Sequence, residues 1–129
     1  NEVWSYGEEI YEICVRYMKI REKMRPYIME QMKLAHEKGT PVMRPLFFDY
    51  PDDQKAWDIE DQYMFGPDIL VAPVVYYGMR NRKVYLPRGE WVLIHTGETF
   101  TGGQTIDCPT ALAEMPVFVR KEREEIFND

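Results

Sequence analysis

The sequence predicts an α+β protein in which a helix–strand–helix segment is followed by an antiparallel, sandwich-like β domain. Apolar residues recur at spacings of three and four over the first third of the 129-residue chain, as in an amphipathic helix. A nearly continuous apolar run comes next, and beyond Gly66-Pro67 short β-type runs alternate with Gly and Pro. We therefore divide the chain into residues 1–66 and residues 67–129, two regions of different architecture.

The first predicted element is a long helix. Ser5 fits an N-cap with Glu8 three residues later, which is the spacing of a capping box. Gly39 followed by Pro41 is a stop signal, because Gly accepts the left-handed conformation and Pro cannot continue a helix. Pro26 lies inside the pattern and should kink or divide the helix. One face collects the apolar residues Ile10, Ile13, Tyr17, Ile20, Met24, Ile28, Met32 and Ala35.

The run "VMRPLFFDY" predicts one buried strand that ends at Asp49. The run is almost continuously apolar, as are strands covered on both faces, although Pro45 removes a ladder donor and argues against a strand. Asp52 and Asp53 then fit caps of a short helix. A long helix and one doubly covered strand need neighbours that these residues do not supply, so we expect the chain to be the end of something larger.

Four short runs predict the strands of the second region. They are "ILVAPVVY", "KVYLP", "EWVLIH" and "MPVFVRK", at residues 69–76, 83–87, 90–95 and 115–121. Their Gly and Pro boundaries indicate an antiparallel sandwich or small barrel. We interpret the basic cluster "RNRK" at 80–83 as a solvated hairpin tip.

Composition disfavours several partners. The net charge of −6 disfavours nucleic acid, because phosphate binding needs a basic face. No stretch reaches the roughly 18 apolar residues of a membrane helix, so no membrane partner is expected. Cys14 and Cys108 lack CxxC spacing and fit two reduced, buried thiols in a reducing compartment, which leads us to expect a cytoplasmic protein.

Few side chains offer nucleophilic or metal chemistry. Ser5 is the single serine and no GxSxG motif occurs. His36 and His95 lie on different predicted elements without a partner at metal-ligand spacing, so we expect neither a metal nor a cofactor. Trp91 could offer a ring on which a sugar stacks, but its alternation with Val92 and Leu93 favours a core residue.

Carboxylates remain as candidate acids, because glycosidases work with two carboxyl groups that flank the scissile bond. Asp49 leads these candidates, since in (β/α)8 barrels the carboxyl ends of the strands carry the chemistry. Several other acidic residues fit a solvated, capped helix better than catalysis: Asp52, Asp53, Asp58, Glu60 and Asp61.

Four segments carry a family resemblance: "RPYIMEQMKLAHEKGTPVMRPLFFDYPDD", "DQYMFGPDILVAPVV", "VYLPRGEWVLIHTGETFTGG" and "PVFVRK". In this order they resemble the C-terminal part of glycoside hydrolase family 31, which includes α-glucosidases and α-xylosidases. The blocks "RPLFFDYPDD" and "FGPDILVAPV" are the most specific. The resemblance extends from about Trp4 to Arg120, and the spacing is most similar to that of the α-xylosidase branch.

The resemblance implies a place for each region. The family joins a (β/α)8 catalytic barrel to β-sandwich domains. Residues 1–40 would be the helix after barrel strand seven, residues 42–49 strand eight, and residues 53–65 the closing helical segment, so that 1–66 is a remnant of the barrel's end. Residues 67–129 would be the proximal C-terminal β domain.

The resemblance also implies which residues do not act. The family's nucleophile, acid/base and substrate-binding histidine lie in motifs upstream of these, so no catalytic or substrate-binding residue is carried over to this chain. Asp49 and Arg44 are expected at most to support the site, as an ion pair with each other or with a group of the missing barrel.

The resemblance implies a fragment of an α-glycosidase that hydrolyses terminal α-linked sugars of oligosaccharides with retention. This fragment would be inactive by itself. An alternative is an accessory carbohydrate-binding module, which would use Trp91, Tyr76 and Tyr77.

A third hypothesis is an unrelated small enzyme in which Asp49 works with Asp68 or Glu60. Independently of the function, a barrel cut at this point exposes apolar faces, and such faces drive association. We therefore expect the chain to self-associate, with its long helix forming an antiparallel dimer.

Overall fold

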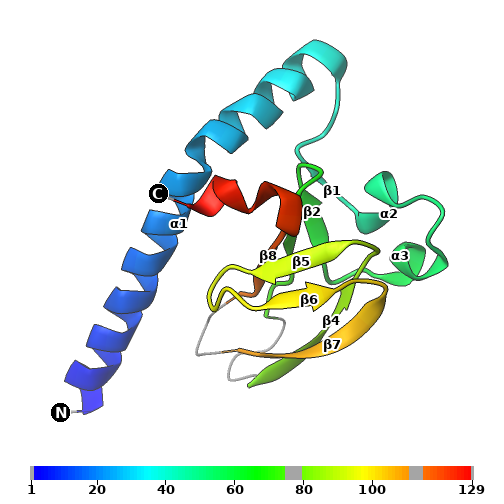
Figure 1. Cartoon of the computed structure of the whole chain (residues 1–129). Helices are drawn as coiled ribbons and strands as arrows, with labels where there is room; N and C mark the ends of the chain where they lie inside the picture. The colour runs from blue at the N-terminus through cyan, green and yellow to red at the C-terminus, as the bar shows by residue number, and fades with distance from the viewer. Residues whose placement is uncertain (1, 75–79, 111–114, 129) are drawn as a thin grey trace.

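The computed structural model describes residues 2–74, 80–110 and 115–128, whose arrangement Figure 1 shows. The helices are α1 (Glu2–Lys38), α2 (Leu46–Asp49), α3 (Gln54–Asp58) and the 3-10 helix η1 (Lys121–Phe127). The strands are β1 (Met43–Arg44), β2 (Tyr63–Phe65), β3 (Ile69–Val71), β4 (Asn81–Leu86), β5 (Glu90–Leu93), β6 (Thr99–Thr101), β7 (Gln104–Pro109) and β8 (Val117–Arg120). They form an antiparallel six-stranded sheet, ordered β1-β2-β3-β8-β5-β6, and a two-stranded ribbon of β4 and β7.

The six-stranded sheet contributes to two cores, because successive side chains of a strand point to opposite faces. On one face, Met64, Leu70, Trp91 and Phe118 pack under the β4–β7 ribbon and the α2–α3 segment. We call this the ribbon core, and its other fully or nearly buried members are Leu46, Tyr50, Ala56, Ala72, Val84, Tyr85, Leu86, Leu93 and Cys108. Two antiparallel sheets that pack over one core confirm the sandwich-like arrangement predicted for the β region.

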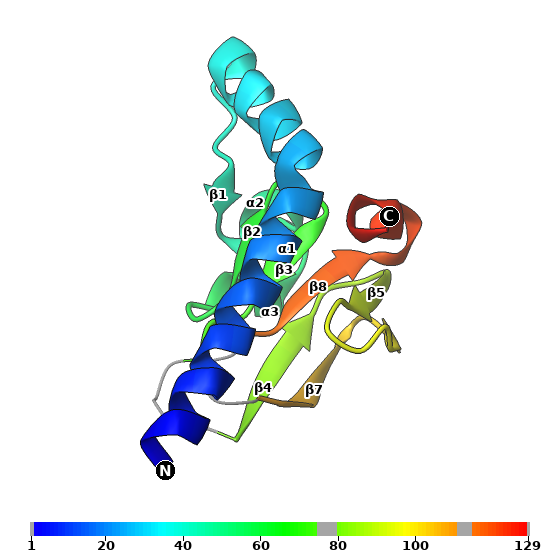
Figure 2. The ribbon, with the colours of Figure 1, turned by 90° about the vertical axis from the view of Figure 1, so that its left-hand side faces the viewer.

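On the opposite face, helices from both ends of the chain cover the sheet. Figure 2 shows α1 in front of the strands, with η1 at its side. Tyr27 of α1 and Ile126 of η1 close this second core, which we call the helix core. Its strand residues are Ile69, Val71, Val92, Val117 and Val119.

Helix α1 differs from its prediction at the N-terminal end. It begins at Glu2, so Ser5 lies inside the helix and the predicted N-cap is wrong. The helix is not divided at Pro26, although Figure 1 shows its axis changing direction in the C-terminal half. Gly39 ends the helix as predicted, with φ of 70° and its N–H donating to the carbonyl of Ala35 at 2.9 Å.

The predicted apolar face of α1 is only partly the buried one. Tyr27 and Gln31 are buried, whereas Met32, which was assigned to the packed face, is 59% exposed. The Tyr27 hydroxyl has polar partners on the sheet, donating to the carbonyl of Phe65 and accepting from the N–H of Asp68. These bonds select which face of the helix meets the strands, and the spacing of apolar residues does not reveal them.

The predicted strand at 42–49 is wrong, and with it the placement of Asp49 at the end of a core strand. Only Met43–Arg44 pair with β2, and residues 46–49 form a single helical turn, α2. Pro45 stands between them with φ of −67° and ψ of 161°, at the N-cap of α2. Because proline has no N–H to donate, it ends the strand ladder there and suits the start of a helical turn.

The helical segment predicted at 53–65 is partly wrong. Asp53 caps α3 as predicted, because its carboxylate accepts from the N–H of Lys55 at 3.0 Å. The helix ends at Asp58, however, and residues 63–65 are strand β2. The proposed domain boundary falls in the turn between β2 and β3, which are paired strands of one sheet.

The "RNRK" cluster is solvated only in part: Arg80, Asn81 and Lys83 are exposed, whereas Arg82 is buried. Residues 81–83 belong to β4, and Arg82 is 5% exposed, with Nη1 donating to Asp61 Oδ2 at 3.0 Å. Strands β6 and β7 and the helix η1 had no counterpart among the predicted elements. The end of the predicted strand 69–76 lies outside the described residues.

Candidate functional site

The carboxylate of Asp49 is held by Arg44 in a two-pronged ion pair. Arg44 Nε donates to Asp49 Oδ2 and Nη2 donates to Oδ1, both at 2.8 Å. The remaining nitrogen, Nη1, donates to the carbonyl of Pro41 at 2.7 Å. The Arg44 side chain is 4% exposed and that of Asp49 is 13% exposed. A planar guanidinium that engages both carboxylate oxygens fixes the geometry of both groups, so the pair ties α2 to β1.

Exposed apolar side chains lie next to this pair. The Phe48 ring centroid is 4.8 Å from the Arg44 guanidinium carbon, and the Phe47 and Trp57 rings stack with centroids 4.1 Å apart. Phe48 and Trp57 are about half exposed, as is Met43 on β1. Large apolar side chains that gather on neighbouring elements mark a surface that contacts something else.

A second buried carboxylate, Asp68, joins the sheet to η1. Arg123 Nη1 donates to Asp68 Oδ2 at 3.1 Å, and Arg120 Nε lies 3.8 Å from Asp68 Oδ1. The backbone N–H of Asp68 donates to the Tyr27 hydroxyl, which connects α1 to the same point. Burial raises the pKa of the Asp68 carboxyl, and the two arginines oppose that rise.

The acid/base pair of Asp49 with Asp68 or Glu60 finds little geometric support. Arg44 occupies both oxygens of Asp49, and Arg120 and Arg123 hold Asp68. Glu60 is exposed to solvent. Carboxylates that are bound to arginines in this way suit structural connections better than proton transfer.

Trp91 is fully buried, and its indole N–H donates to the carbonyl of Pro87 at 2.9 Å. The core interpretation of Trp91 is therefore confirmed, and its ring offers no platform for a sugar. Tyr76 and Tyr77, the other aromatic residues of that alternative, lie outside the described residues.

His95 and Cys108 line a hollow of about 330 Å³. His95 Nε2 lies 3.1 Å from the carbonyl of Met115, so this nitrogen carries the proton, and its ring meets Tyr17 edge-on. Cys108 is buried, as predicted, whereas the Cys14 side chain lies outside the described residues. His36 lies in the last turn of α1.

Neither a metal cluster nor a membrane span emerges from the described part of the chain. Within residues 2–74, 80–110 and 115–128, no three His, Cys, Asp or Glu side chains gather in a way that could hold a metal ion. None of the described helices is both long enough and apolar enough to cross a bilayer.

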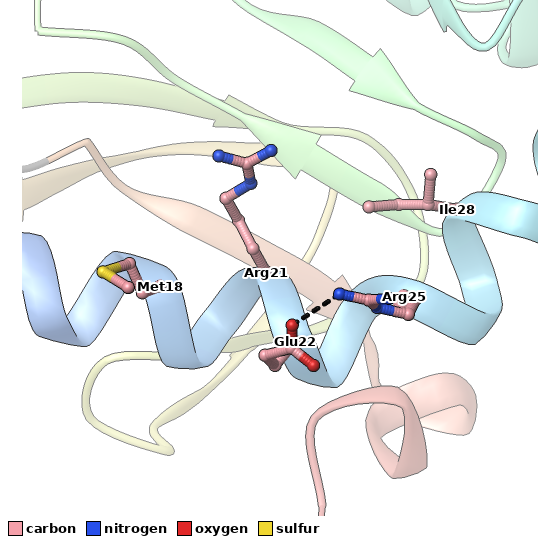
Figure 3. Close-up of a pocket in the computed structure, with 5 residues that line it drawn as sticks. All are labelled: Met18, Arg21, Glu22, Arg25 and Ile28. Atoms are coloured by element: carbon pink, nitrogen blue, oxygen red, sulfur yellow. Dashed lines mark hydrogen bonds and ion pairs between the residues drawn. The ribbon is translucent and has the colours of Figure 1, made fainter.

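A hollow of about 380 Å³ lies along the outer surface of α1, and Figure 3 shows the side chains that line it. These side chains are Met18, Arg21, Glu22, Arg25 and Ile28. All belong to α1, so the hollow is a depression on a helix surface, and the dashed line in Figure 3 is the ion pair between Glu22 and Arg25.

Several polar side chains that hold the fold together had no place in the sequence prediction. Gln62 is an example: its side chain donates to the carbonyl and accepts from the N–H of Tyr85, both at 2.8 Å. Tyr27, Arg82 and Arg123 are others. Their one signal in the sequence is that each is a polar or amphipathic residue close to apolar runs, which does not identify a partner.

The comparisons with known proteins agree on one family. The family model for the glycosyl hydrolase family 31 C-terminal domain matches residues 39–123. A solved structure of a family 31 α-xylosidase from a soil metagenome, complexed with xylose, superposes with a TM-score of 0.88 at 56% identity and covers 97% of this chain. The chain therefore belongs to glycosyl hydrolase family 31.

Curated relatives give the same assignment. An α-xylosidase of Saccharolobus solfataricus is 39% identical over 93% of the chain, and α-glucosidase 2 of Bacillus thermoamyloliquefaciens is 37% identical over 94%. The chain spans only 17% of the length of the Saccharolobus α-xylosidase, 15% of the Bacillus α-glucosidase and 19% of the soil-metagenome enzyme. It thus corresponds to the C-terminal part of family 31 glycosidases.

Proposed function

We propose that the chain is the C-terminal part of an α-glycosidase of the α-xylosidase or α-glucosidase type, which hydrolyses terminal α-linked sugars with retention. The observation that carries this proposal is the superposition of nearly the whole chain on less than a fifth of an α-xylosidase that was solved with xylose. An oligosaccharide or a simple α-glycoside would be the substrate of the longer enzyme.

In this proposal the chain supports the active site and lacks the catalytic groups. Retaining glycosidases need a nucleophile and an acid/base about 5–5.5 Å apart. The buried carboxylates of Asp49 and Asp68 are bound to arginines, so neither resembles a nucleophile that faces a sugar. The isolated chain would therefore be inactive, with both catalytic aspartates supplied by preceding residues.

Residues 1–66 would complete the catalytic barrel through α1 and the α2–α3 segment, whereas β1 belongs to the antiparallel sheet. The exposed side chains of Met43, Phe48 and Trp57 support this role, because a large preceding domain would cover them. The buried Arg44–Asp49 pair would hold α2 in place beneath that contact.

An activity assay tests the proposal. The purified chain is compared with a polypeptide that carries the same residues behind a complete upstream barrel, using p-nitrophenyl α-xyloside and p-nitrophenyl α-glucoside. We expect activity in the longer polypeptide alone. Asp49→Asn in the longer polypeptide should lower the stability of the protein. It should leave the pH dependence of hydrolysis unchanged. Hydrolysis by the short chain that Asp49→Asn abolishes would overturn the proposal.

A second candidate function is that of a non-catalytic carbohydrate-binding module. Because Trp91 is buried, Trp57 and Phe48 would be the residues that contact the sugar. These rings are 52% and 46% exposed, and an exposed aromatic face can stack on a sugar ring. Calorimetric titration of the chain with xylo- and gluco-oligosaccharides tests it. Saturable binding that Trp57→Ala abolishes and Tyr11→Ala preserves would favour this candidate.

A further inference from the structure

Helix α1 contributes little to the cores of the rest of the chain. Among the residues that the structure describes, Tyr27 is its single buried member of the helix core. Nearer the N-terminus, the Tyr17 hydroxyl accepts from the N–H of Met115. The other buried members of the helix core come from β3, β5, β8 and η1: Ile69, Val71, Val92, Val117, Val119 and Ile126. The helix therefore lies on the sheet as an added layer, which Figure 2 shows.

The main polar contact of α1 is with the turn between β2 and β3. The Tyr27 hydroxyl donates to the carbonyl of Phe65 at 3.1 Å and accepts from the N–H of Asp68 at 3.0 Å. The Arg123 guanidinium carbon lies 5.6 Å from the centre of the Tyr27 ring, and Nη1 of Arg123 donates to Asp68 at 3.1 Å. One side chain of α1 is thus bound by the turn and by η1 together.

Gly66 makes the close approach of Tyr27 possible. Its φ of 64° lies in the left-handed region, which favours glycine. A Cβ atom at this position would overlap the Tyr27 hydroxyl, and it would lie 2.8 Å from Cζ of that ring and 3.0 Å from Cδ of Gln31. Gln31 is buried one turn further along α1. The turn therefore forms a socket that stays open to the helix because Gly66 has no side chain.

The end of α1 coincides with the start of the matched family domain. That domain covers residues 39–123, so it begins directly after the helix. A hollow of about 350 Å³ remains between α1 and η1. Contacts between two domains of one chain are more polar than a shared core, and the contact made by Tyr27 has this character.

We infer that α1 is a helix of the preceding domain, and that the chain beyond Gly39 presents a preformed docking surface for it at the β2–β3 turn. Gly66, Asp68 and Arg123 form that surface, and Tyr27 is the side chain that they bind. The assignment of α1 to the preceding domain rests on the proposed function, whereas the docking surface does not. The domain boundary then lies at Gly39, in place of the one predicted after residue 66.

A single cut tests the inference on the full chain. A protease site inserted between Gly39 and Thr40 allows the folded chain to be cut there, and size-exclusion chromatography over a dilution series follows the association of the two parts. They should elute together at about 100 μM and separate on dilution, with a dissociation constant on the order of 1–10 μM. After separation, the amides of β4 and β7 should stay protected from hydrogen exchange, because the ribbon core contains no described residue of α1.

Gly66→Ala should raise the dissociation constant of the cut parts at least about tenfold, because the added methyl group meets Tyr27. Gly97→Ala is the matched control: Gly97 also has a positive φ, 79°, but a Cβ there meets open space, so the dissociation constant should not change. Tyr27→Ala should weaken association as well. Adding Gly66→Ala to it should weaken association no further, because both changes act on one contact.

Circular dichroism checks that each variant is folded, and Tyr27→Ala decides alone if Gly66→Ala does not fold. Loss of protection in β4 and β7 on separation would overturn the inference, because α1 would then be part of the domain that it contacts. So would cut parts that are already separate at about 100 μM, or equal effects of the two glycine variants. An inactive longer polypeptide would contradict the proposed function alone, because association of the cut parts does not depend on hydrolysis.

Discussion

The two faces of the six-stranded sheet are covered in different ways. The ribbon core draws its members from between Leu46 and Phe118, and it contains large rings: Tyr50, Trp91 and Phe118. The helix core is mostly aliphatic, and α1 and η1 reach it from opposite ends of the chain. The hydrogen bonds of the Tyr27 hydroxyl and the Asp68–Arg123 ion pair also hold the two helices on this face of the sheet.

This difference shows where the stability of the molecule should reside. Burial of large rings contributes most of the free energy of unfolding, so the ribbon core should dominate. The helix core should depend on a few directional bonds and respond to their loss locally. Four changes test this difference between the two cores, and they follow in order of decreasing predicted effect.

Trp91→Ala should lower the free energy of unfolding by about 3–5 kcal/mol, because it leaves a cavity in the ribbon core and an unpaired carbonyl at Pro87. Urea denaturation followed by circular dichroism measures the change. Trp57→Ala is the matched control, since Trp57 is 52% exposed, and it should cost about 1 kcal/mol or less. Equal losses in the two variants would contradict the dominance of the ribbon core.

Arg44→Ala should cost about 3 kcal/mol, because it leaves the mostly buried carboxylate of Asp49 without its partner. Arg44→Lys keeps the charge but loses the two-pronged geometry, so its cost should lie between those of the alanine variant and the unaltered chain. The exposed pair of Lys83 and Asp107 is the control, and Lys83→Ala should change stability by less than about 0.5 kcal/mol. Thermal unfolding curves of the three variants decide the order.

Tyr27→Phe should cost about 1–2 kcal/mol, because it removes a hydroxyl that bonds to the Phe65 carbonyl and the Asp68 N–H. Hydrogen exchange should accelerate in α1 and η1 and stay unchanged in β4 and β7. Uniform acceleration in all strands would show that the two cores unfold as one unit. Tyr11→Phe, at an exposed position, provides the baseline.

The smallest effect concerns alkaline pH. Burial, and next the hydrogen bond to Asp53, raise the pKa of Tyr85 to about 12 from 10.0. Since the folded pKa is the higher one, the stabilisation from this hydroxyl is intact below pH 10 and is lost as the pH rises toward 12. The slope is at most about 1.4 kcal/mol per pH unit. Unfolding of the unaltered chain and Tyr85→Phe between pH 9 and 11 should give converging stabilities, and parallel curves would refute this assignment.

The sequence was informative where a signal is local. Asp53 caps α3 because its carboxylate reaches an N–H two residues away, and short runs rich in Val, Ile and Leu became β3, β5 and β8. It was misleading at 46–49, since an apolar run of that length fits a strand and a helical turn equally. Strands β6 and β7 escaped prediction because many of their side chains are polar and exposed.

For the candidate site, the sequence predicted which two residues form a pair but not their geometry. Arg44 and Asp49 were singled out together, yet their two-pronged geometry follows from the turn at Pro45, which the sequence does not display as such. The Asp68 connection to Tyr27 and Arg123 joins residues far apart in the chain, and no single spacing could reveal it.

Strand β8 lies between β3 and β5 in the sheet, although it is the last strand of the chain. During synthesis on the ribosome, β1 to β3 and β5 to β6 therefore emerge as two sheet halves with no shared edge. They can join only after residues 117–120 leave the exit tunnel, and η1 follows directly. The six-stranded sheet can therefore close only after residues 117–120 have been synthesised.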